Sequence, residues 1–304
     1  MGVGHGHGQG GTTSAGGRHR WRLAISFAII AVFFVVELVV GIVSGSLALI
    51  SDAGHMAADV VALGAALVAT KIATRADSTG RRTYGSYRAE VFASGLAVLM
   101  MLGVSVYVVV EAIARMGEDV EVQTGPMLVV GLLGLLVNIA ALLMLRAGAK
   151  DSINVKGAYL EVVADTAGSV GVLVAGGLIL ATGSGVWDTV VAFLIGGFVA
   201  VRAVMLGREV LAVLGQHVPA GMEIEAVTTS LAAVPGVCDV HDLHVWTLTS
   251  GMNVATAHLV LGEDADAEAA LRQGQAVLRE QHHIEHATLQ VEGYRSSACD
   301  AVSW

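Results

Sequence analysis

Charged residues are scarce in this chain: they make up 14% of its 304 residues, whereas ordinary domains carry roughly a quarter. Hydrophobic residues reach 55%, and the mean hydropathy is +0.70. The two cysteines, Cys238 and Cys299, are too few for a disulfide framework or a dense thiolate metal site. This composition excludes a soluble globule. The net charge of −9 has no basic excess and argues against a nucleic-acid partner.

Signals for secretion and for catalysis are missing as well. The glycine-rich, polar start of the chain lacks the short apolar core of a signal peptide, and we expect residues 1–20 to form a disordered tail. No Ser/His/Asp, Cys/His or phosphate-loop arrangement stands out, so an enzyme is not expected.

Apolar residues instead gather in six long runs, each about as long as a helix needs to cross a hydrocarbon core ~30 Å thick. The runs are Leu23–Val43, Leu47–Ile72, Tyr87–Ile113, Met127–Leu145, Val155–Ala181 and Val186–Leu206. They predict an all-α, six-helix membrane domain over residues 21–208, embedded in a lipid bilayer.

Basic residues orient this domain, because cytoplasmic loops carry an excess of Lys and Arg. They cluster in the amino-terminal tail, between the second and third runs, between the fourth and fifth, and at the exit of the sixth, where Arg202 and Arg208 lie. The third-to-fourth loop is acidic instead. We therefore expect both termini in the cytoplasm. The short loops suit a bacterial plasma (inner) membrane.

The chain changes character after Arg208, where a small α+β domain is expected over residues 209–295, followed by a tail over 296–304. Helical and β-rich stretches alternate as Met222–Val234, Val237–Leu248, Met252–Leu261, Asp266–Gln281 and Ala287–Val291. This αββαβ order is typical of a ferredoxin-like fold.

Ionisable residues inside the apolar runs carry the strongest functional signal, since each costs roughly 2.5–3.5 kcal/mol at a helix centre. The second run holds Asp52, His55 and Asp59, whose spacings of three and four place them on one helical face. The fifth run holds Glu161 and Asp165, again four apart.

Two helices that each offer such a pair can gather one imidazole and three carboxylates around a point. His nitrogen and carboxylate oxygen form a four-coordinate shell suited to Zn²⁺. We therefore expect His55, Asp59, Glu161 and Asp165 to bind a metal ion. A structural polar network or a proton-only relay is the alternative.

Other polar residues in the runs are less specific. Glu37 and Asp52 are candidates for proton carriers or for partners of the metal ligands. Asp188, at the start of the sixth run, is interpreted as a helix cap. Asn138 is expected to form a hydrogen bond between helices, and small residues such as Gly41 and Gly168 would allow helices to approach closely.

Three segments together resemble the cation diffusion facilitator family: S-D-A-G-H-M-A-A-D in the second run, N-V-K-G-A-Y-L-E-V-V-A-D-T-A-G-S-V-G-V in the fifth, and H-D-L-H-V-W in the small domain. The resemblance spans Trp21 to Glu292. It implies a homodimer of six-helix protomers with a cytoplasmic ferredoxin-like domain. It also implies exchange of a metal, usually zinc, for protons.

The resemblance assigns His55, Asp59 and Asp165 to the family's transport site. Glu161 departs from the pattern, because zinc-selective relatives usually place His there. A site with more carboxylate ligands selects less strongly for zinc. Cobalt, cadmium, manganese or nickel therefore remain alternative substrates.

In the small domain, the resemblance implies a regulatory or dimer-bridging metal site made by His241, His258 and either His286 or Glu292. His244 lies three residues after His241 on one expected strand, so the two should face opposite sides. The alternative is that the histidines of the small domain are ordinary surface residues and bind no metal. His5, His7 and His19 in the tail could collect metal or be inert.

The sequence thus predicts a divalent cation exporter that exchanges zinc for protons and has no organic cofactor. A metal-gated channel and a membrane metal sensor are the competing hypotheses, which flux and its pH dependence would separate.

Overall fold

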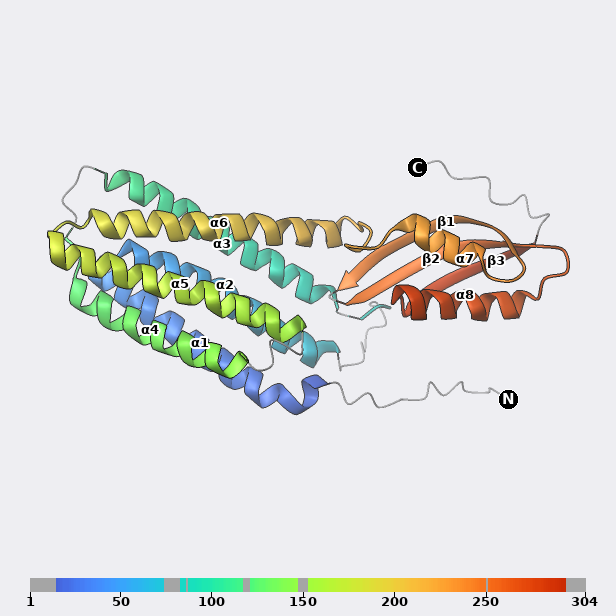
Figure 1. Cartoon of the computed structure of the whole chain (residues 1–304), viewed down its shortest axis with the longest axis horizontal. Helices are drawn as coiled ribbons and strands as arrows, with labels where there is room; N and C mark the ends of the chain where they lie inside the picture. The colour runs from blue at the N-terminus through green and yellow to red at the C-terminus, as the bar shows by residue number, and fades with distance from the viewer. Residues whose placement is uncertain are drawn as a thin grey trace. The chain divides into compact units, whose positions relative to one another are not determined.

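The computed structural model describes the backbone of residues 15–73, 83–85, 87–116, 121–146, 153–249 and 251–293 (Figure 1). Side chains are described over the same ranges, with the exception of residues 15–27, 62–63, 65–73, 145, 153–158 and 160–161. Residues 1–14 and 294–304, which contain most of the two predicted tails, lie outside the described part, as do the side chains of His5, His7 and His19.

Six long helices lie within the described residues: α1 (Ala15–Ser44), α2 (Leu47–Ala73), α3 (Arg88–Ala114), α4 (Thr124–Leu145), α5 (Ile153–Thr182) and α6 (Val186–Leu214). They match the six predicted runs with two differences. The first helix begins at Ala15, inside the predicted tail, and the sixth continues to Leu214, eight residues beyond its predicted end.

Membrane-spanning character is clearest in α3, α4, α5 and α6. In the described residues, each of these four contains a stretch long and apolar enough to cross a bilayer. A shorter apolar stretch, Ala28–Ser44, belongs to α1. Their outward surfaces are apolar too, with exposed side chains such as Leu133, Leu180 and Leu194. These helices form a membrane domain.

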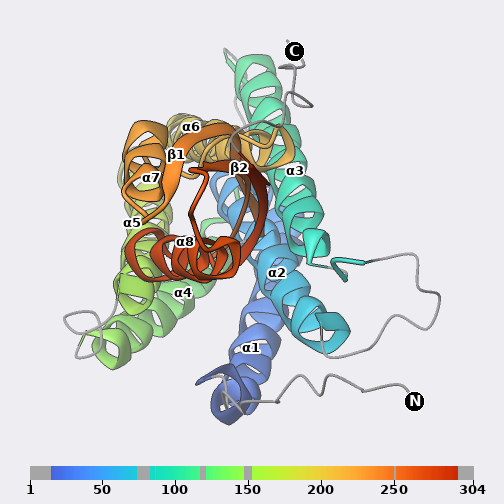
Figure 2. The ribbon, with the colours of Figure 1, turned by 90° about the vertical axis from the view of Figure 1, so that its right-hand side faces the viewer.

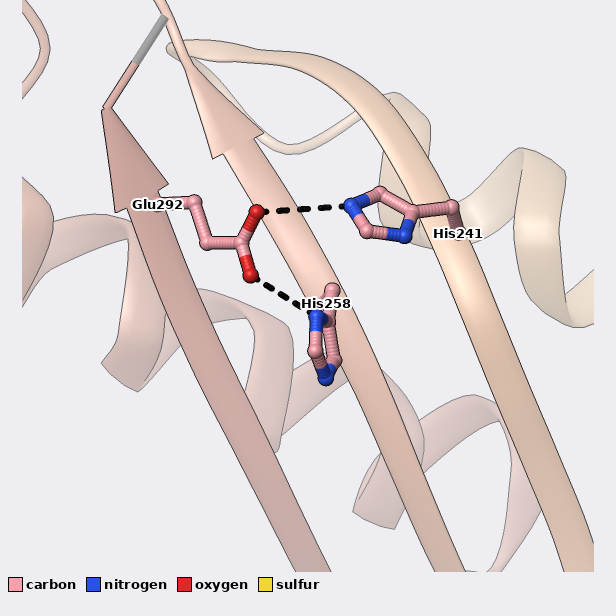
Figure 3. A group of neighbouring side chains, drawn as sticks. All are labelled: His241, His258 and Glu292. Carbon is pink, nitrogen blue, oxygen red and sulfur yellow. Dashed lines mark ion pairs between the residues drawn. The ribbon is translucent and has the colours of Figure 1, made fainter. Parts of the chain in front are cut away.

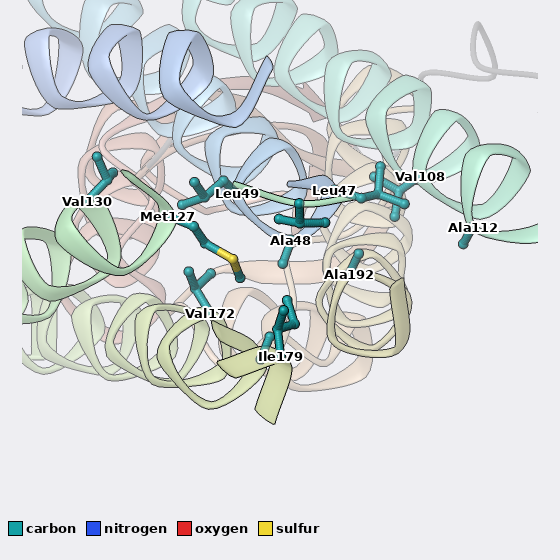
Figure 4. Packing of buried hydrophobic residues seen from close by; sticks show 12 residues of the cluster. Leu47, Ala48, Leu49, Val108, Ala112, Met127, Val130, Val172, Ile179 and Ala192 are labelled. Atoms are coloured by element: carbon teal, nitrogen blue, oxygen red, sulfur yellow. The ribbon is translucent and has the colours of Figure 1, made fainter. Parts of the chain in front are cut away.

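The chain divides into two compact units, the first made of Met1–Lys71 with Leu96–Val204, and the second of Ile72–Gly95 with Met205–Trp304. In the first unit, buried Leu47 and Leu49 of α2 pack with residues of α3, α4, α5 and α6 in one apolar cluster (Figure 4). Glycines permit close approach. A Cβ atom at Gly54 would meet Val104 at 2.2 Å, and one at Gly41 would meet Leu49 at 3.1 Å. The first half of α2 thus lies in the interior of the unit.

The start of α2 is held by a carboxylate from another helix. Asp188 of α6, fully buried, accepts hydrogen bonds from the Ser46 hydroxyl at 2.6 Å and from the backbone N–H groups of Leu47 and Ala48 at 2.6 and 3.2 Å. The first N–H groups of a helix have no partner within the helix, so an acidic group there is stabilising. Asp188 is therefore a helix cap, as predicted, but it caps α2 and not its own helix.

A polar contact also joins α4 to α5. The side-chain amide of Asn138 donates to the Ser169 hydroxyl at 3.3 Å, which confirms the predicted hydrogen bond between helices.

The second unit contains α7 (Ile224–Ala232), β1 (Val237–Thr249), β2 (Met252–Leu261), α8 (Ala267–His282) and β3 (His286–Gly293), in the predicted order. The strands form a sheet in the order β1-β2-β3, antiparallel between β1 and β2 and parallel between β2 and β3. Parallel neighbours need a long crossover, which α8 provides. Asp266 caps α8 by accepting from the N–H groups of Glu268 and Ala269.

One apolar core joins the two helices to the sheet. Val227 and Leu231 of α7 and Leu278 of α8 are buried with Ala257 and Leu259 of β2. Because alternate strand residues share a face, both helices cover the same side of the sheet; Figure 2 shows them beside the strands. The strand residues that alternate with these apolar ones, among them His258, lie on the other side of the sheet.

Candidate metal centres

Helix α2 and helix α5 bring three predicted ligands together. His55 Nε2 lies 3.0 Å from Asp165 Oδ1 and 3.9 Å from Asp59 Oδ2, and one ligand atom from each residue lies within 4.8 Å of the others. The His55 side chain is 5% exposed, whereas those of Asp59 and Asp165 are 25% and 22% exposed. The spacing of four on α2 places His55 and Asp59 one turn apart on the same face.

The geometry of this cluster is compatible with a small cation. Two ligands of a tetrahedral ion with bonds of about 2.0–2.2 Å lie about 3.4 Å apart, close to the observed separations. Asp165 Oδ1 is buried and has no hydrogen-bond partner among the described residues, although His55 Nε2 is 3.0 Å away. A carboxylate oxygen and an imidazole nitrogen at this separation can bind a positive charge between them.

The fourth predicted ligand, Glu161, lies on α5 one turn before Asp165, but its side chain is outside the described residues. Its participation stays a prediction from the spacing.

Asp52 and Glu37 are buried next to this cluster. Asp52 is one turn before His55 on α2, and its carboxyl group is within hydrogen-bonding reach of Glu37 on α1. A Cβ atom at Gly168 of α5 would lie 2.6 Å from Asp52 Oδ1, so this glycine makes room for the carboxylate. Glu37 Oε2 has no hydrogen-bond partner among the described residues. A buried, unpaired carboxylate oxygen is costly unless a proton occupies the pair.

The sheet of the second unit carries another cluster, on the face opposite α7 and α8. His241, His258 and Glu292 come from β1, β2 and β3, respectively (Figure 3). Glu292 Oε1 lies 2.7 Å from His258 Nδ1, and Glu292 Oε2 lies 3.4 Å from His241 Nε2. The Glu292 side chain is buried, while the two imidazoles are partly exposed. Three N/O ligands with solvent access can accept a divalent ion.

An irregularity in β1 changes the predicted positions of two histidines. His241 pairs with His258 and His244 pairs with Thr256, two residues apart on β2, so both histidines face the same side. The cause is a β-bulge at Asp242, which has a positive φ of 51°. The expectation that His241 and His244 face opposite sides was wrong for this reason. Asp242 itself lies 2.8 Å from His244 Nε2 and 3.8 Å from His258 Nε2.

His286 is not brought to this cluster. It begins β3, six residues before Glu292, and its ring packs edge-on against Tyr84 with 5.5 Å between ring centroids. Of the two alternatives for the third ligand, the structure places Glu292, and not His286, beside His241 and His258.

Comparison with known proteins separates a transmembrane domain from a carboxy-terminal domain. The pattern of the cation efflux transmembrane domain matches residues 23–214, and that of the cytoplasmic domain of cation efflux proteins matches residues 219–294. The chain belongs to the cation efflux family. The resemblance to the cation diffusion facilitators is thereby confirmed.

Individual cation efflux proteins align over nearly the whole chain. The metal cation efflux system protein CzcD of Cupriavidus metallidurans is 40% identical over 293 residues, which cover 96% of this chain and 90% of that protein. The zinc transporter ZitB of Pectobacterium atrosepticum is 36% identical, covering 92% and 86%. The cadmium, cobalt and zinc/H(+)-K(+) antiporter of Bacillus velezensis is 32% identical, covering 95% and 92%.

Sequence reasoning missed two residues at the sites of this cation efflux protein. Arg202 was assigned to the charges at the exit of the sixth run, yet it lies within α6 and its Nη1 is 2.8 Å from His55 Nε2. An arginine preceded by the apolar residues of α6 was the available signal. Asp242 was missed because no sequence pattern marked the bulge.

Proposed function

We propose that this chain is a six-span membrane protein that exports a divalent cation, with zinc as the principal substrate, in exchange for protons. The observation that carries the proposal is the approach of His55, Asp59 and Asp165 within the membrane domain. Ionisable residues within a membrane are costly and mark ion pathways. The similarity to metal efflux proteins over nearly the whole chain supports the same function.

Zinc is favoured by the imidazole and carboxylate donors of the cluster and by the similarity to a zinc transporter. Glu161 on α5 would add a further carboxylate. Cobalt and cadmium are therefore the next candidates, in keeping with the name of the Bacillus velezensis relative, and manganese and nickel follow.

Proton exchange follows from the chemistry of the ligands. Carboxylates and imidazole bind a metal ion only when deprotonated, so metal binding releases protons and protonation releases metal. The buried pair of Glu37 and Asp52 offers a place where a proton can be held beside the cluster. Alternating access would then expose the cluster to one side of the membrane at a time.

The orientation follows from the distribution of basic residues, with both termini in the cytoplasm of a plasma (inner) membrane. In that orientation residues 209–295 form a cytoplasmic domain, for which we propose the ferredoxin-like fold. The match to the cytoplasmic domain of cation efflux proteins supports this assignment and a homodimer. His241, His258 and Glu292 would bind a regulatory metal ion there, biasing transport if its affinity differs between states.

The test is metal-driven proton movement in proteoliposomes that contain a pH dye and, in parallel samples, a metal indicator. Zinc, cobalt, cadmium, manganese and nickel are each added to wild type and to Glu161→His. We expect a proton signal that accompanies zinc uptake, and a narrower preference for zinc in Glu161→His.

Two outcomes would replace the proposal. Metal flux with no proton signal would indicate a channel. Metal binding without flux of any of the five ions would indicate a sensor.

A further inference from the structure

Arg202 is a positive charge inside the membrane domain, at the candidate transport site. It lies on α6, half-buried, four residues after Phe198, and its guanidinium carbon is 6.0 Å from the centre of the Phe198 ring. Its Nη1 is 2.8 Å from His55 Nε2. Both residues belong to the first compact unit. An arginine within a membrane helix is energetically costly and marks a functional site. The contact between Arg202 and His55 therefore indicates a function for Arg202.

The contact uses the atom that a metal ion needs. His55 Nε2 is the nitrogen that lies 3.0 Å from Asp165 and 3.9 Å from Asp59, and it is therefore the donor that would face a bound ion. A guanidinium group has only hydrogen-bond donors, so His55 Nε2 must accept from Arg202. An imidazole nitrogen has one lone pair. It cannot accept from Arg202 and coordinate a metal at the same time.

The charges of Arg202 and of a metal ion also indicate that the two exclude each other at His55. The guanidinium group stays protonated at all physiological pH values. In the observed arrangement it places one positive charge on the histidine that the two carboxylates surround. A divalent cation in the cluster would bring two positive charges to the same place, and like charges repel strongly where water is scarce. Arg202 and the metal ion are therefore alternatives at His55.

We propose that Arg202 is a built-in cation that takes the place of the metal at His55 when the transport site is empty. This inference rests on the proposed function. Metal binding displaces the guanidinium from His55. The displaced charge then lowers the affinity for the ion and favours its release. With Arg202 back on His55, the carboxylates of the empty site remain partly neutralised, which makes the return step less costly in a medium of low dielectric.

Arg202→Gln tests the proposal, with zinc transport by the full chain in proteoliposomes as the measurement. Removal of the competing charge should lower the KM for zinc about tenfold. The kcat should fall as well, because release is slower and the empty site carries an uncompensated charge. Arg208→Gln is the matched control: Arg208 lies on the same helix, six residues later, and is exposed. It should leave both constants unchanged.

A merely structural role would lower kcat without lowering KM, so an unchanged or raised KM in folded Arg202→Gln would overturn the proposal. Arg202→Lys covers the case in which the glutamine variant does not fold. Lysine keeps the charge but lacks the planar guanidinium group, so it should compete less well for His55, and we expect its KM to lie below that of wild type. A KM equal to or above that of wild type would overturn the proposal.

Asp165→Asn in the same assay separates this inference from the proposed function. Transport by Asp165→Asn equal to wild type would remove the proposed site, and both ideas would fall. Loss of transport in Asp165→Asn together with an unaltered KM in Arg202→Gln would leave the proposed function intact and remove the built-in cation alone.

Discussion

The two histidine–carboxylate clusters of this protein differ in how well their own atoms satisfy one another. The sheet cluster consists of His241, His258 and Glu292, and both oxygens of Glu292 have partners. Oε1 lies near His258 Nδ1 and accepts from the Gln290 amide, and Oε2 lies near His241 Nε2. The helix cluster consists of His55, Asp59 and Asp165. There, His55 Nδ1 and Asp165 Oδ1 are buried with no hydrogen-bond partner among the described residues. The polar atoms of the sheet cluster thus find more partners within the protein than those of the helix cluster do among the described residues.

The difference reflects the elements that carry the ligands. Neighbouring strands fix their side chains by backbone hydrogen bonds across the sheet, so His241 and His258 are directly opposite each other. Helices α2 and α5 pack through side chains, and small shifts between the helices change the distances within the cluster. This difference agrees with the proposal that the helix cluster binds the transported ion and the sheet cluster a regulatory one.

The largest expected effect separates the roles of the clusters. Asp165→Asn should lower zinc transport in proteoliposomes by at least about a hundredfold, because it removes a charged ligand from the helix cluster. Glu292→Gln should keep more than about a tenth of the wild-type rate under the same conditions. Equal losses in the two variants would contradict the division of roles.

Glu292→Gln should instead show its effect on metal bound at the sheet. We expect its affinity for zinc to fall about 10- to 100-fold, since the carboxylate that joins the two imidazoles is lost. Isothermal titration calorimetry of the full chain in detergent measures this affinity. The same titration of Asp165→Asn measures zinc binding at the sites other than the helix cluster. The exposed Glu285→Gln is a control of the same chemistry and should bind zinc as wild type does.

Steric pressure on Asp52 tests how sensitive the helix cluster is to small displacements. Gly168→Ala would place a methyl group 2.6 Å from Asp52 Oδ1, and we expect a cost of about 1–3 kcal/mol with transport reduced about tenfold. Gly177→Ala is the matched control on the same helix, because a Cβ atom there meets no described atom within 4 Å. A Gly168→Ala protein as active as Gly177→Ala would show that Asp52 has room to move.

Loss of the cap on α2 should weaken the helical unit. Asp188→Ala removes the acceptor for Ser46, Leu47 and Ala48, which should cost about 1–2 kcal/mol. The thermal unfolding of the helical unit, followed by circular dichroism in detergent, should move to lower temperature. Zinc binding at the sheet cluster should not change. A loss of zinc binding at the sheet cluster as well would contradict the inference that Asp188 acts locally, at the start of α2.

The smallest expected effect is a pH dependence in the second unit. Burial, and then the nearby His283, lowers the pKa of His282 below its usual value of 6.5. The unfolded chain therefore takes up the proton first as the pH falls. The stabilising contribution is complete above pH 6.5 and is lost between 6.5 and the lower pKa of the folded state. His282→Gln should reduce the loss of thermal stability between pH 7 and pH 5. The exposed His217→Gln is the control and should leave this loss unchanged.

Much of this architecture could be predicted from hydropathy and spacing. The six long helices and the three strands were placed within a few residues, apart from the start of α1 and the end of α6. Apolar runs of spanning length and β-rich stretches are local signals, and they survive in the tertiary structure. The pairing of His55 with Asp59 was equally local, because a spacing of four fixes one face of a helix.

Contacts between distant segments could not be predicted in this way. Asp188 was expected to cap a helix, but only the packing of α6 against α2 decided which helix it caps. His244 changed sides because a single bulged residue, Asp242, shifts the alternation of the strand. Neither outcome follows from periodicity, since each depends on a neighbour far away in the sequence or on one unusual backbone angle.

The sequence by itself determined that this chain enters a membrane, that costly ionisable residues lie on its second and fifth helices, and that a small α+β domain follows. These conclusions depend on hydropathy and on residue spacing, which are properties of the chain alone. Tertiary structure decided that Asp165 meets His55 at 3.0 Å, that Glu292 rather than His286 meets the sheet histidines, and that Arg202 reaches His55. The reason is physical: distances between side chains on different helices and strands exist only after those elements pack.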